Sequence, residues 1–206
     1  RSNLIITSSK FNYDIFNKYD NDCCLIENGV SSDFIAQSSN FPHKTKKSRP
    51  RLGYVGWITE RTDLDLLNHI ARKCTGCDIV IAGPDIGLLS ASKVLDNSNV
   101  EYLGAIPQED VPLLLQTFDI CLIPHKITTY SQSMSPLKLY QYLASGRPIV
   151  STSVAGTEKF TTLITLADSF DSFVDAIYAT LSNDSIVKST TRINAAKKES
   201  WESRIQ

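Results

Sequence analysis

The 206-residue sequence lacks a long apolar run, an excess of either charge, and more than a few histidines. Its longest apolar stretches fall far short of the ~20 residues that cross a bilayer. Its 21 basic and 22 acidic residues argue against a polyanion-binding protein, so we expect no nucleic-acid partner. The start of the sequence does not resemble a signal peptide. Because it begins with Arg1 and runs almost at once into an apolar strand, we expect a fragment of a longer protein.

Cysteine is too scarce and too irregular for a disulfide framework, with five residues in the whole sequence. Cys74 and Cys77 have C-x-x-C spacing, which admits a redox or metal site. No second pair and no histidine at zinc-finger spacing would complete four zinc ligands. We therefore interpret Cys74 and Cys77 as a helix end and a buried strand residue, and expect a reducing, cytoplasmic setting.

Two nucleotide-binding signatures are missing as well. The sequence has neither G-x-G-x-x-G nor G-x-x-x-x-G-K-[ST], which disfavours a dinucleotide-dependent dehydrogenase and a P-loop enzyme.

What the sequence does contain is an alternation of strands and helices from residue 51 onward. The expected strands are 52–56, 78–82, 100–103, 119–123 and 148–151, and the expected helices are 63–73, 108–118, 136–145, 169–181 and 186–201, with a part-helical segment at 86–95. An earlier strand, helix and strand are expected at 4–7, 9–19 and 23–26. Short strands that are apolar on both faces predict an α/β fold: a Rossmann-like parallel sheet with helices on both faces.

The polar stretch 37–51 divides the sequence. Its basic residues are Lys44, Lys46, Lys47, Arg49 and Arg51, with no acid among them. Such a run can touch nucleic acid or anionic lipid. A solvated linker is the favoured interpretation, because no aromatic residue interleaves the charges and the remainder of the chain offsets them. We place a domain boundary here.

Ligands of open parallel sheets bind beyond the carboxyl ends of the strands. That rule selects the loops 56–62, 83–87, 104–108, 124–136 and 152–157. The most informative stretch is 133–152. Pro136 at a helix start would leave the amides of Leu137 and Lys138 free, and Gln141 would lie one turn further on the same face. Free amides, the positive end of a helix dipole and a lysine suit a phosphate with an attached sugar.

Residues 136–150 read P-x-K-x-Y-x-Y-x-A-x-G-x-P-x-V, which resembles the sugar-nucleotide motif of the retaining, group 1 GT-B glycosyltransferases. Other segments resemble that family in the same order. Residues 25–30 resemble its interdomain crossover, 54–57 its first phosphate-facing loop, 100–104 and 118–124 two later strands, and 200–202 the start of its last helix.

The resemblance implies the C-terminal, donor-binding half of a GT-B enzyme. Residues 1–24 would be a remnant of the N-terminal acceptor domain, 25–50 the crossover and basic linker, 51–184 the nucleotide-sugar-binding domain and 185–206 a C-terminal helix. The implied reaction transfers sugar from a nucleoside diphosphate sugar to a hydroxyl of a saccharide or lipid-linked acceptor, in polysaccharide or glycoconjugate synthesis. It needs no metal and no further cofactor. The base would lie in the missing domain, which could also associate with the inner face of a membrane, and this fragment alone would be inactive.

The sequence departs from the family at the two motif glutamates, which are replaced by Ser133 and Gln141. Trp57 stands at the usual arginine position, so Arg61, Lys126 and Lys138 would supply the positive charge. We interpret His125 as a surface or structural residue. The expected donor-binding residues are Gly56, Trp57, Arg61, Gly83, Ile106, Lys126, Ser133, Ser135, Leu137, Lys138 and Gln141. Two alternatives stay open: a catalytically inactive sugar-nucleotide-binding module and, ranked last, a GT-B sugar-nucleotide epimerase.

Overall fold

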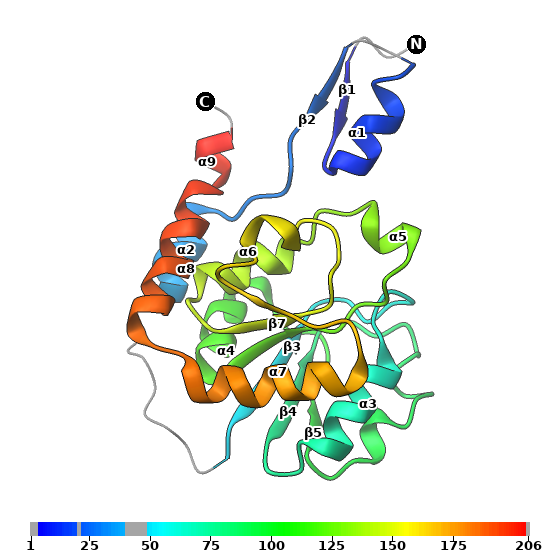
Figure 1. The fold of residues 1–206 in the computed structure, drawn as a ribbon, viewed down its shortest axis with the longest axis vertical. Helices are drawn as coiled ribbons and strands as arrows, with labels where there is room; N and C mark the ends of the chain where they lie inside the picture. The colour runs from blue at the N-terminus through cyan, green and yellow to red at the C-terminus, as the bar shows by residue number, and fades with distance from the viewer. Residues whose placement is uncertain (1–3, 20–21, 40–48, 205–206) are drawn as a thin grey trace.

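The computed structural model describes residues 4–19, 22–39 and 49–204 (Figure 1). Its centre is a six-stranded sheet in the order β5-β4-β3-β6-β7-β8, and every neighbouring pair is parallel. The strands are β3 (Arg51–Val55), β4 (Asp78–Ala82), β5 (Val100–Tyr102), β6 (Ile120–Ile123), β7 (Ile149–Ser151) and β8 (Thr165–Leu166). The sheet order reverses between β3 and β6, where doubly wound folds bind their ligands.

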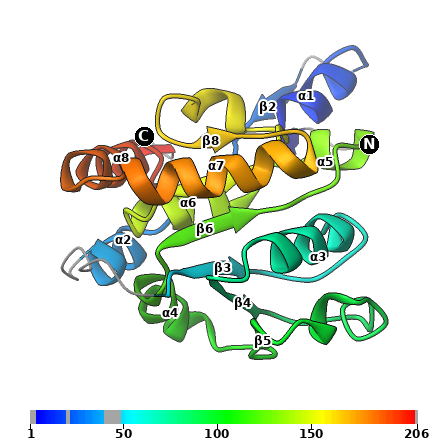
Figure 2. The same ribbon diagram turned by 60° about the horizontal axis from the view of Figure 1, so that its bottom comes forward.

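Helices cover both faces of this sheet. The main helices are α2 (Ser32–Ser39), α3 (Leu64–Lys73), α4 (Val111–Thr117), α6 (Leu137–Ala144), α7 (Phe170–Asn183) and α8 (Ile186–Lys198). One core lies under α2, α4, α6 and α8, and the other lies under α3 and α7 together with the 3₁₀ turn η1 (Val94–Asp96). Figure 2 shows α3 and α4 on opposite sides of the strands. The predicted Rossmann-like α/β sheet is confirmed.

The strands serve the two cores alternately. In β3, Leu52 and Tyr54 point into the core under α3 and α7, whereas Val55 points into the other. Gly53 also faces the second core, where a Cβ atom would lie 2.1 Å from the ring of Phe118. A side chain at Gly53 is therefore excluded by packing.

The first described residues form a small unit of their own. Strands β1 (Ile5–Thr7) and β2 (Cys23–Leu25) pair in parallel, with α1 (Lys10–Phe16) between them in sequence. Figure 1 shows this unit apart from the six-stranded sheet, near α5 (Thr129–Gln132) and α6. The amide of the Asn12 side chain donates to the carbonyl of Ser133 across that space, at 3.2 Å.

The segment after β2 lies beside the end of the chain. Val30 and Ser200 form an isolated parallel bridge, in which the Val30 amide donates to Glu199 and the Trp201 amide donates to Val30. Gly29 is required here, because a Cβ atom would lie 2.8 Å from the Glu199 carbonyl. The short helix α9 (Trp201–Arg204) then completes the described chain.

Several predicted elements need correction. Helix α2 takes up the start of the stretch expected to be a solvated linker, and its Ser38 is buried. The helix expected at 186–201 is broken after Lys198, because residues 199–201 bond to Val30 instead. Segment 86–95 is mostly turns that end in η1, and α5 and β8 were not expected. Of the basic run, Lys44, Lys46 and Lys47 lie outside the described residues, while Arg49 pairs with Asp78 at 2.6 Å.

Cys74 and Cys77 occupy the predicted structural positions. Cys74 caps the end of α3, Cys77 directly precedes β4, and both are buried free thiols. Burial raises the pKa of Cys77 to about 11, which keeps the thiol protonated and unreactive at neutral pH. Across the three described ranges, no helix has the length and apolar character needed to cross a membrane.

Candidate functional site

The loops after β3, β4 and β6 meet beyond the carboxyl ends of their strands. The loop after β3, residues 56–62, is called the first loop below. Isolated bridges join its Ile58 to Asp85 in the loop after β4, and its Thr62 to His125 in the loop after β6. Gly83 packs so closely on the first loop that a Cβ atom would lie 2.2 Å from the carbonyl oxygen of Gly56. Gly56 and Gly83 also have φ of 144° and 135°, so these loops need glycine for both conformation and space.

The buried Tyr54 hydroxyl shapes the first loop from below. It donates to the carbonyl of Trp57 at 2.9 Å and contacts the Thr62 hydroxyl at 3.2 Å. Burial raises the pKa of Tyr54 to about 12, so the phenol stays neutral and leaves the site without a counter-charge.

Lys138, in the first turn of α6, lies over this tyrosine. Its Nζ is 3.8 Å from the centre of the Tyr54 ring and 3.2 Å from Nε2 of His125. A Cβ atom on Gly56 would lie 2.8 Å from the same Nζ. Burial, and then the charge of Arg61, hold the pKa of Lys138 well below its usual range. The lysine predicted to face a phosphate is therefore partly buried beyond the ends of β3 and β6.

Arg61 brings a second cation from the first loop. Its guanidinium contacts Sδ of Met134 at 2.9 Å and donates to the Thr59 hydroxyl at 3.2 Å, and it lies 5.4 Å from the centre of the Tyr130 ring. All of these partners are neutral. Among the described residues, neither Arg61 nor Lys138 forms an ion pair with a carboxylate.

The start of α6 adds free amide groups beside the two cations. Pro136 precedes the helix without a side-chain cap, and the first helical bond runs from the Leu139 amide to the Pro136 carbonyl at 3.0 Å. The amides of Leu137 and Lys138 have no acceptor within the described ranges. The arrangement predicted from Pro136, Leu137 and Lys138 is present, and it can bind an anion.

His125 follows β6 and is buried rather than exposed. Its backbone amide donates to the Thr152 hydroxyl at 3.2 Å, and that hydroxyl donates back to the His125 carbonyl at 2.8 Å. Burial, followed by Lys138 and Arg61, holds the pKa of His125 well below its usual value. Its contact with Lys138 could not be predicted from the sequence, because the contact forms only where the loop after β6 meets the start of α6.

The two serines expected to bind the donor have hydrogen-bond partners within the described chain. The hydroxyl of Ser133 donates to the Tyr130 carbonyl at 2.8 Å. Ser135 is buried, and its hydroxyl accepts from the Asn28 amide at 3.0 Å, while its carbonyl accepts from the Asn28 side chain at 2.6 Å. Ser135 thus joins the segment after β2 to the start of α6.

The remaining predicted residues differ in how far they are exposed. Trp57 is 62% exposed and Leu137 is 43% exposed. Lys126 is exposed too, with its backbone amide on the Arg61 carbonyl at 2.8 Å. The side chain of Ile106 packs against the core under α2 and α4. The half-buried side chain of Gln141 makes no hydrogen bond to the rest of the described chain.

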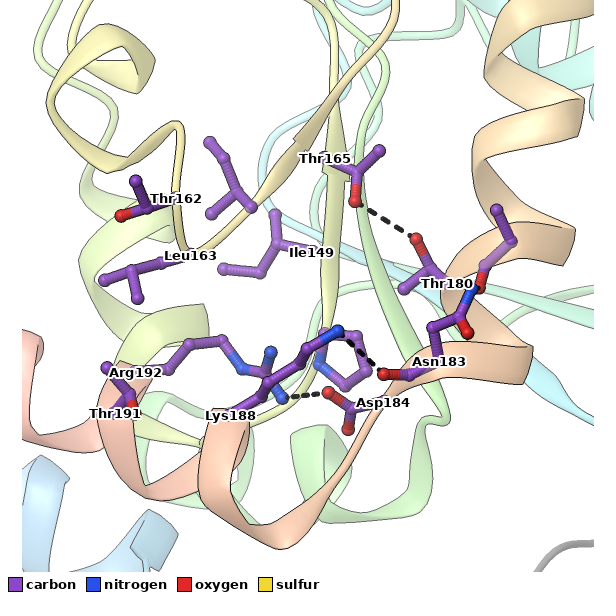
Figure 3. A pocket seen from close by; sticks show the side chains of 13 residues that line it. Ile149, Thr162, Leu163, Thr165, Thr180, Asn183, Asp184, Lys188, Thr191 and Arg192 are labelled. Carbon is purple, nitrogen blue, oxygen red and sulfur yellow. Dashed lines mark hydrogen bonds and ion pairs between the residues drawn. The ribbon is translucent and has the colours of Figure 1, made fainter.

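A cavity of about 350 Å³ lies elsewhere, at the amino ends of β7 and β8 (Figure 3). Its polar groups bond to one another: Thr165 to Thr180 at 3.1 Å, Lys188 to the Asn183 carbonyl at 2.8 Å, and Arg192 to Asp184 at 2.7 Å. None of the predicted donor-binding residues lines it. Within the described ranges, no three potential metal ligands converge at either place.

Comparison with known proteins decides the family. Residues 49–183 match the sequence profile of the glycosyl transferases group 1. The chain belongs to this family. The chain is 29% identical over 139 residues to the putative teichuronic acid biosynthesis glycosyltransferase TuaH of Bacillus subtilis, a match that covers 65% of this chain and 35% of TuaH.

Solved glycosyltransferases share the fold. Anabaena HepE, crystallised with UDP and glucose, superposes with a TM-score of 0.71 at 14% identity, over 97% of this chain and 59% of HepE. Staphylococcus aureus TarM, solved with UDP and two glycan ligands, gives 0.73 at 20% identity, over 98% of this chain and 42% of TarM. The chain therefore has the GT-B Rossmann-like fold but spans only about a third to three-fifths of these relatives.

Proposed function

We propose that this chain is the nucleoside diphosphate sugar-binding half of a group 1 glycosyltransferase that transfers a sugar to a hydroxyl acceptor. The observation that carries the proposal is a pair of basic side chains, Lys138 and Arg61, that have no carboxylate partner among the described residues and lie beside the free amides at the start of α6. Such a site is suited to an anion.

The diphosphate of the donor carries the negative charge that basic side chains and free amides bind. In a sugar transfer, negative charge grows on the leaving diphosphate as the bond to the sugar breaks. Cations and amides held in place beforehand stabilise that charge without rearranging. Lys138 is held by Tyr54 and His125, and Arg61 by Thr59 and Met134, so both are positioned before any ligand arrives.

The acceptor is assigned to the part of the protein that lies beyond residues 25–206. We infer the division predicted from the sequence: residues 1–24 as part of an acceptor domain, 25–50 as crossover, 51–184 as donor domain and 185–206 as the returning C-terminal segment. Two relatives suggest the acceptor class. TuaH is described as a glycosyltransferase of teichuronic acid biosynthesis, and TarM was solved with α-GlcNAc-glycerol. A saccharide or lipid-linked acceptor in polysaccharide or glycoconjugate synthesis fits both, and a lipid-linked one would place the protein at the inner face of the membrane.

Uridine is the first base to test. HepE was solved with UDP-glucose, and TarM was solved with UDP. Neither relative exceeds 20% identity, so GDP and ADP belong in the same experiment.

Isothermal titration calorimetry of the chain with UDP, GDP and ADP tests the proposal. We expect one of the three to bind with weak affinity and to raise the melting temperature. We also expect binding in the presence of EDTA, because Lys138 and Arg61 supply the positive charge. The absence of heat and of stabilisation at millimolar concentrations of all three would contradict the proposal, and a strict magnesium requirement would contradict its metal-free part.

One observation favours a second candidate, a binding module that has lost its catalytic activity. Ser133 and Gln141 stand at the two motif positions, and neither side chain is a carboxylate. In addition, the Ser133 hydroxyl donates to the Tyr130 carbonyl. Both candidates predict nucleotide binding by this chain. Sugar transfer by the full-length protein separates them, since only the enzyme consumes the donor in the presence of acceptor.

A further inference from the structure

We propose that Lys138 and His125 form a proton-sharing pair that takes up a proton from solvent when the donor diphosphate binds, with His125 as the residue that positions the lysine. The inference rests on the proposed function, because it assigns a protonation change to the same diphosphate site.

The amine and the imidazole contact each other in partly buried surroundings that offer few other acceptors. Nζ of Lys138 lies 3.2 Å from Nε2 of His125 and 3.8 Å from the centre of the Tyr54 ring, and Gly56 closes a third side. The Thr152 hydroxyl fixes the backbone of His125, because it accepts from the His125 amide and donates to the His125 carbonyl. The imidazole is therefore a fixed neighbour of the amine.

The charged groups that face the pair are all positive or neutral. Tyr54 on β3 has a neutral phenol, and Arg61 in the first loop has a guanidinium whose charge lowers the pKa of both Lys138 and His125. From α6 and from the loop after β6, the facing titratable groups are Lys138 and His125 themselves. Full protonation of both would place three positive charges together, which the described surroundings do not offset.

The hydrogen-bond pattern agrees with one shared proton. A neutral imidazole has one donor nitrogen and one acceptor nitrogen. When Nε2 accepts from the Lys138 ammonium, the proton of the imidazole lies on Nδ1, which is buried without a partner in the described chain. When the amine is neutral, Nε2–H donates to its lone pair and Nδ1 is a free acceptor. The second form has one proton fewer, and it relieves the repulsion from Arg61.

A bound diphosphate changes this balance. Its two negative charges offset Arg61 and the cost of burial, so the pKa of Lys138 rises and the amine takes a proton from solvent. The ammonium then donates to a phosphate oxygen and to Nε2 of His125. Because the complex binds more protons than the free components, affinity must fall as the pH rises between the free and the bound pKa values of Lys138.

Calorimetry with UDP-glucose measures this uptake. A diphosphate esterified at both ends has no proton to lose in the range pH 6.5–8.5, so a dependence of the binding enthalpy on the ionisation enthalpy of the buffer reports protons bound by the protein. We expect net uptake of up to one proton and an affinity that falls with pH, approaching about tenfold per unit where uptake is complete. Binding without any uptake across this range would overturn the inference while leaving the proposed function intact. Absence of binding would overturn both.

Four variants assign the proton. Lys138→Met should abolish the uptake and flatten the pH dependence of the remaining affinity. His125→Phe removes the acceptor and should weaken binding, whereas His125→Gln, whose side-chain oxygen can accept, should restore part of it. His69→Gln is the matched control, because His69 contacts Asp171 on another part of the surface at 3.0 Å and should leave the uptake unchanged. Uptake that persists in Lys138→Met would contradict the assignment.

NMR titration of the imidazole resonances covers the case in which a variant loses stability. In the unliganded wild-type chain, the imidazole of His125 should stay neutral to a pH well below its ordinary pKa. Saturation with UDP-glucose should shift the Lys138 side-chain resonances to their charged values at a pH where the free protein shows the neutral amine. A lysine that is fully charged in the free protein throughout pH 6.5–8.5 would overturn the proposal.

Discussion

The backbone amide of Asn28 donates to the hydroxyl of Ser135 at 3.0 Å, across 107 positions of sequence. The Asn28 side chain also donates to the Ser135 carbonyl, so the segment after β2 is bonded twice to the residue just ahead of Pro136. The start of α6 is thereby held by a segment that lies far from it in the sequence. The position of the free amides of Leu137 and Lys138 depends on this link.

Ser135→Ala tests that link. The substitution leaves a part-buried amide without its acceptor, which costs about 1–3 kcal/mol of the free energy of unfolding. Urea denaturation of the two chains measures the loss. Ser133→Ala is the control, because its hydroxyl bonds to a carbonyl in the adjacent turn on an exposed surface, and we expect a change below about 0.5 kcal/mol. Equal losses of unfolding free energy in the two variants would mean that the bond between Asn28 and Ser135 adds no stability of its own.

Lys138→Ala should weaken nucleoside diphosphate binding more than nucleoside binding. A hydrogen bond to a charged group is worth about 1.5–3 kcal/mol, and only the diphosphate makes it. Arg61→Ala should show the same selectivity, since the two cations face one anion. Lys188→Ala, at the cavity on the other end of the sheet, is the control. Equal losses of affinity for the nucleoside and for the diphosphate would show that Lys138 acts through packing rather than through a phosphate contact.

Salt should reveal the same contact independently. The affinity for a nucleoside diphosphate should fall as ionic strength rises from 0.1 M to 1 M, where the Debye length shortens from about 10 Å to about 3 Å. The affinity of Lys138→Ala should depend less on salt than that of the unmodified chain. Calorimetry at four salt concentrations is sufficient, and an unchanged slope in the variant would contradict the predicted contact.

Gln141 is predicted to hydrogen-bond the ribose. Its side chain makes no hydrogen bond within the described chain, so Gln141→Ala should spare the fold and cost about 1 kcal/mol of nucleotide affinity. Gln141→Glu places the carboxylate of the family motif at this position and should keep or improve affinity. If both variants bind like the unmodified chain, Gln141 is a helix-surface residue only.

Tyr142 ties α6 to the end of β3. Its buried hydroxyl accepts from the Val55 amide at 2.8 Å and donates to the Val55 carbonyl at 3.2 Å. Tyr142→Phe should lower the free energy of unfolding by about 1–3 kcal/mol, because two buried backbone groups lose their partner. Tyr178→Phe removes an exposed hydroxyl, whose bond to the Lys73 carbonyl is long at 3.4 Å, and should change stability little. Thermal unfolding compares the two.

Acid should destabilise the chain through His125. Its pKa is lowered in the folded state, so below the ordinary value of 6.5 the unfolded state binds a proton that the folded state does not. Stability is therefore full above about pH 6.5 and falls as the pH drops toward the lowered pKa. Melting temperatures from pH 7.5 to 5 should fall less steeply for His125→Gln than for the unmodified chain. A matched slope would show that other groups control acid unfolding.

The sequence predicted the sheet because its signal is local and repeated. Runs such as Ile79–Ala82 are apolar on both faces, and glycine or proline ends the strands near their observed limits. The elements that were missed are short or polar. Strand β8 has two residues, and α2 buries only Phe34, Ile35 and Ser38, so its helical form depends on packing against α4, α6 and α8.

The site was predicted in outline but not in its contacts. The motif placed Lys138 and the free amides at one helix start, since adjacent residues on a helix need no tertiary information. It could not place His125 beside Lys138 or Arg61 beside Met134, because each contact joins two loops that only the sheet brings together. The sequence also does not show which charges face one another in the fold. From the sequence alone, the absence of both motif glutamates indicates a loss of binding groups. The structure adds that little negative charge from the described residues faces Lys138 and Arg61.

Helices α2 and α8 pack on each other and on α6, although they flank the family-matched segment 49–183 on opposite sides. That segment alone therefore lacks two of the helices that pack on α6. During synthesis α2 leaves the ribosome before α6 and α8 leaves after it, so part of the apolar face of α6 stays uncovered until α8 has emerged. Expression of residues 49–183 alone would make that transient exposure permanent, and the product should aggregate.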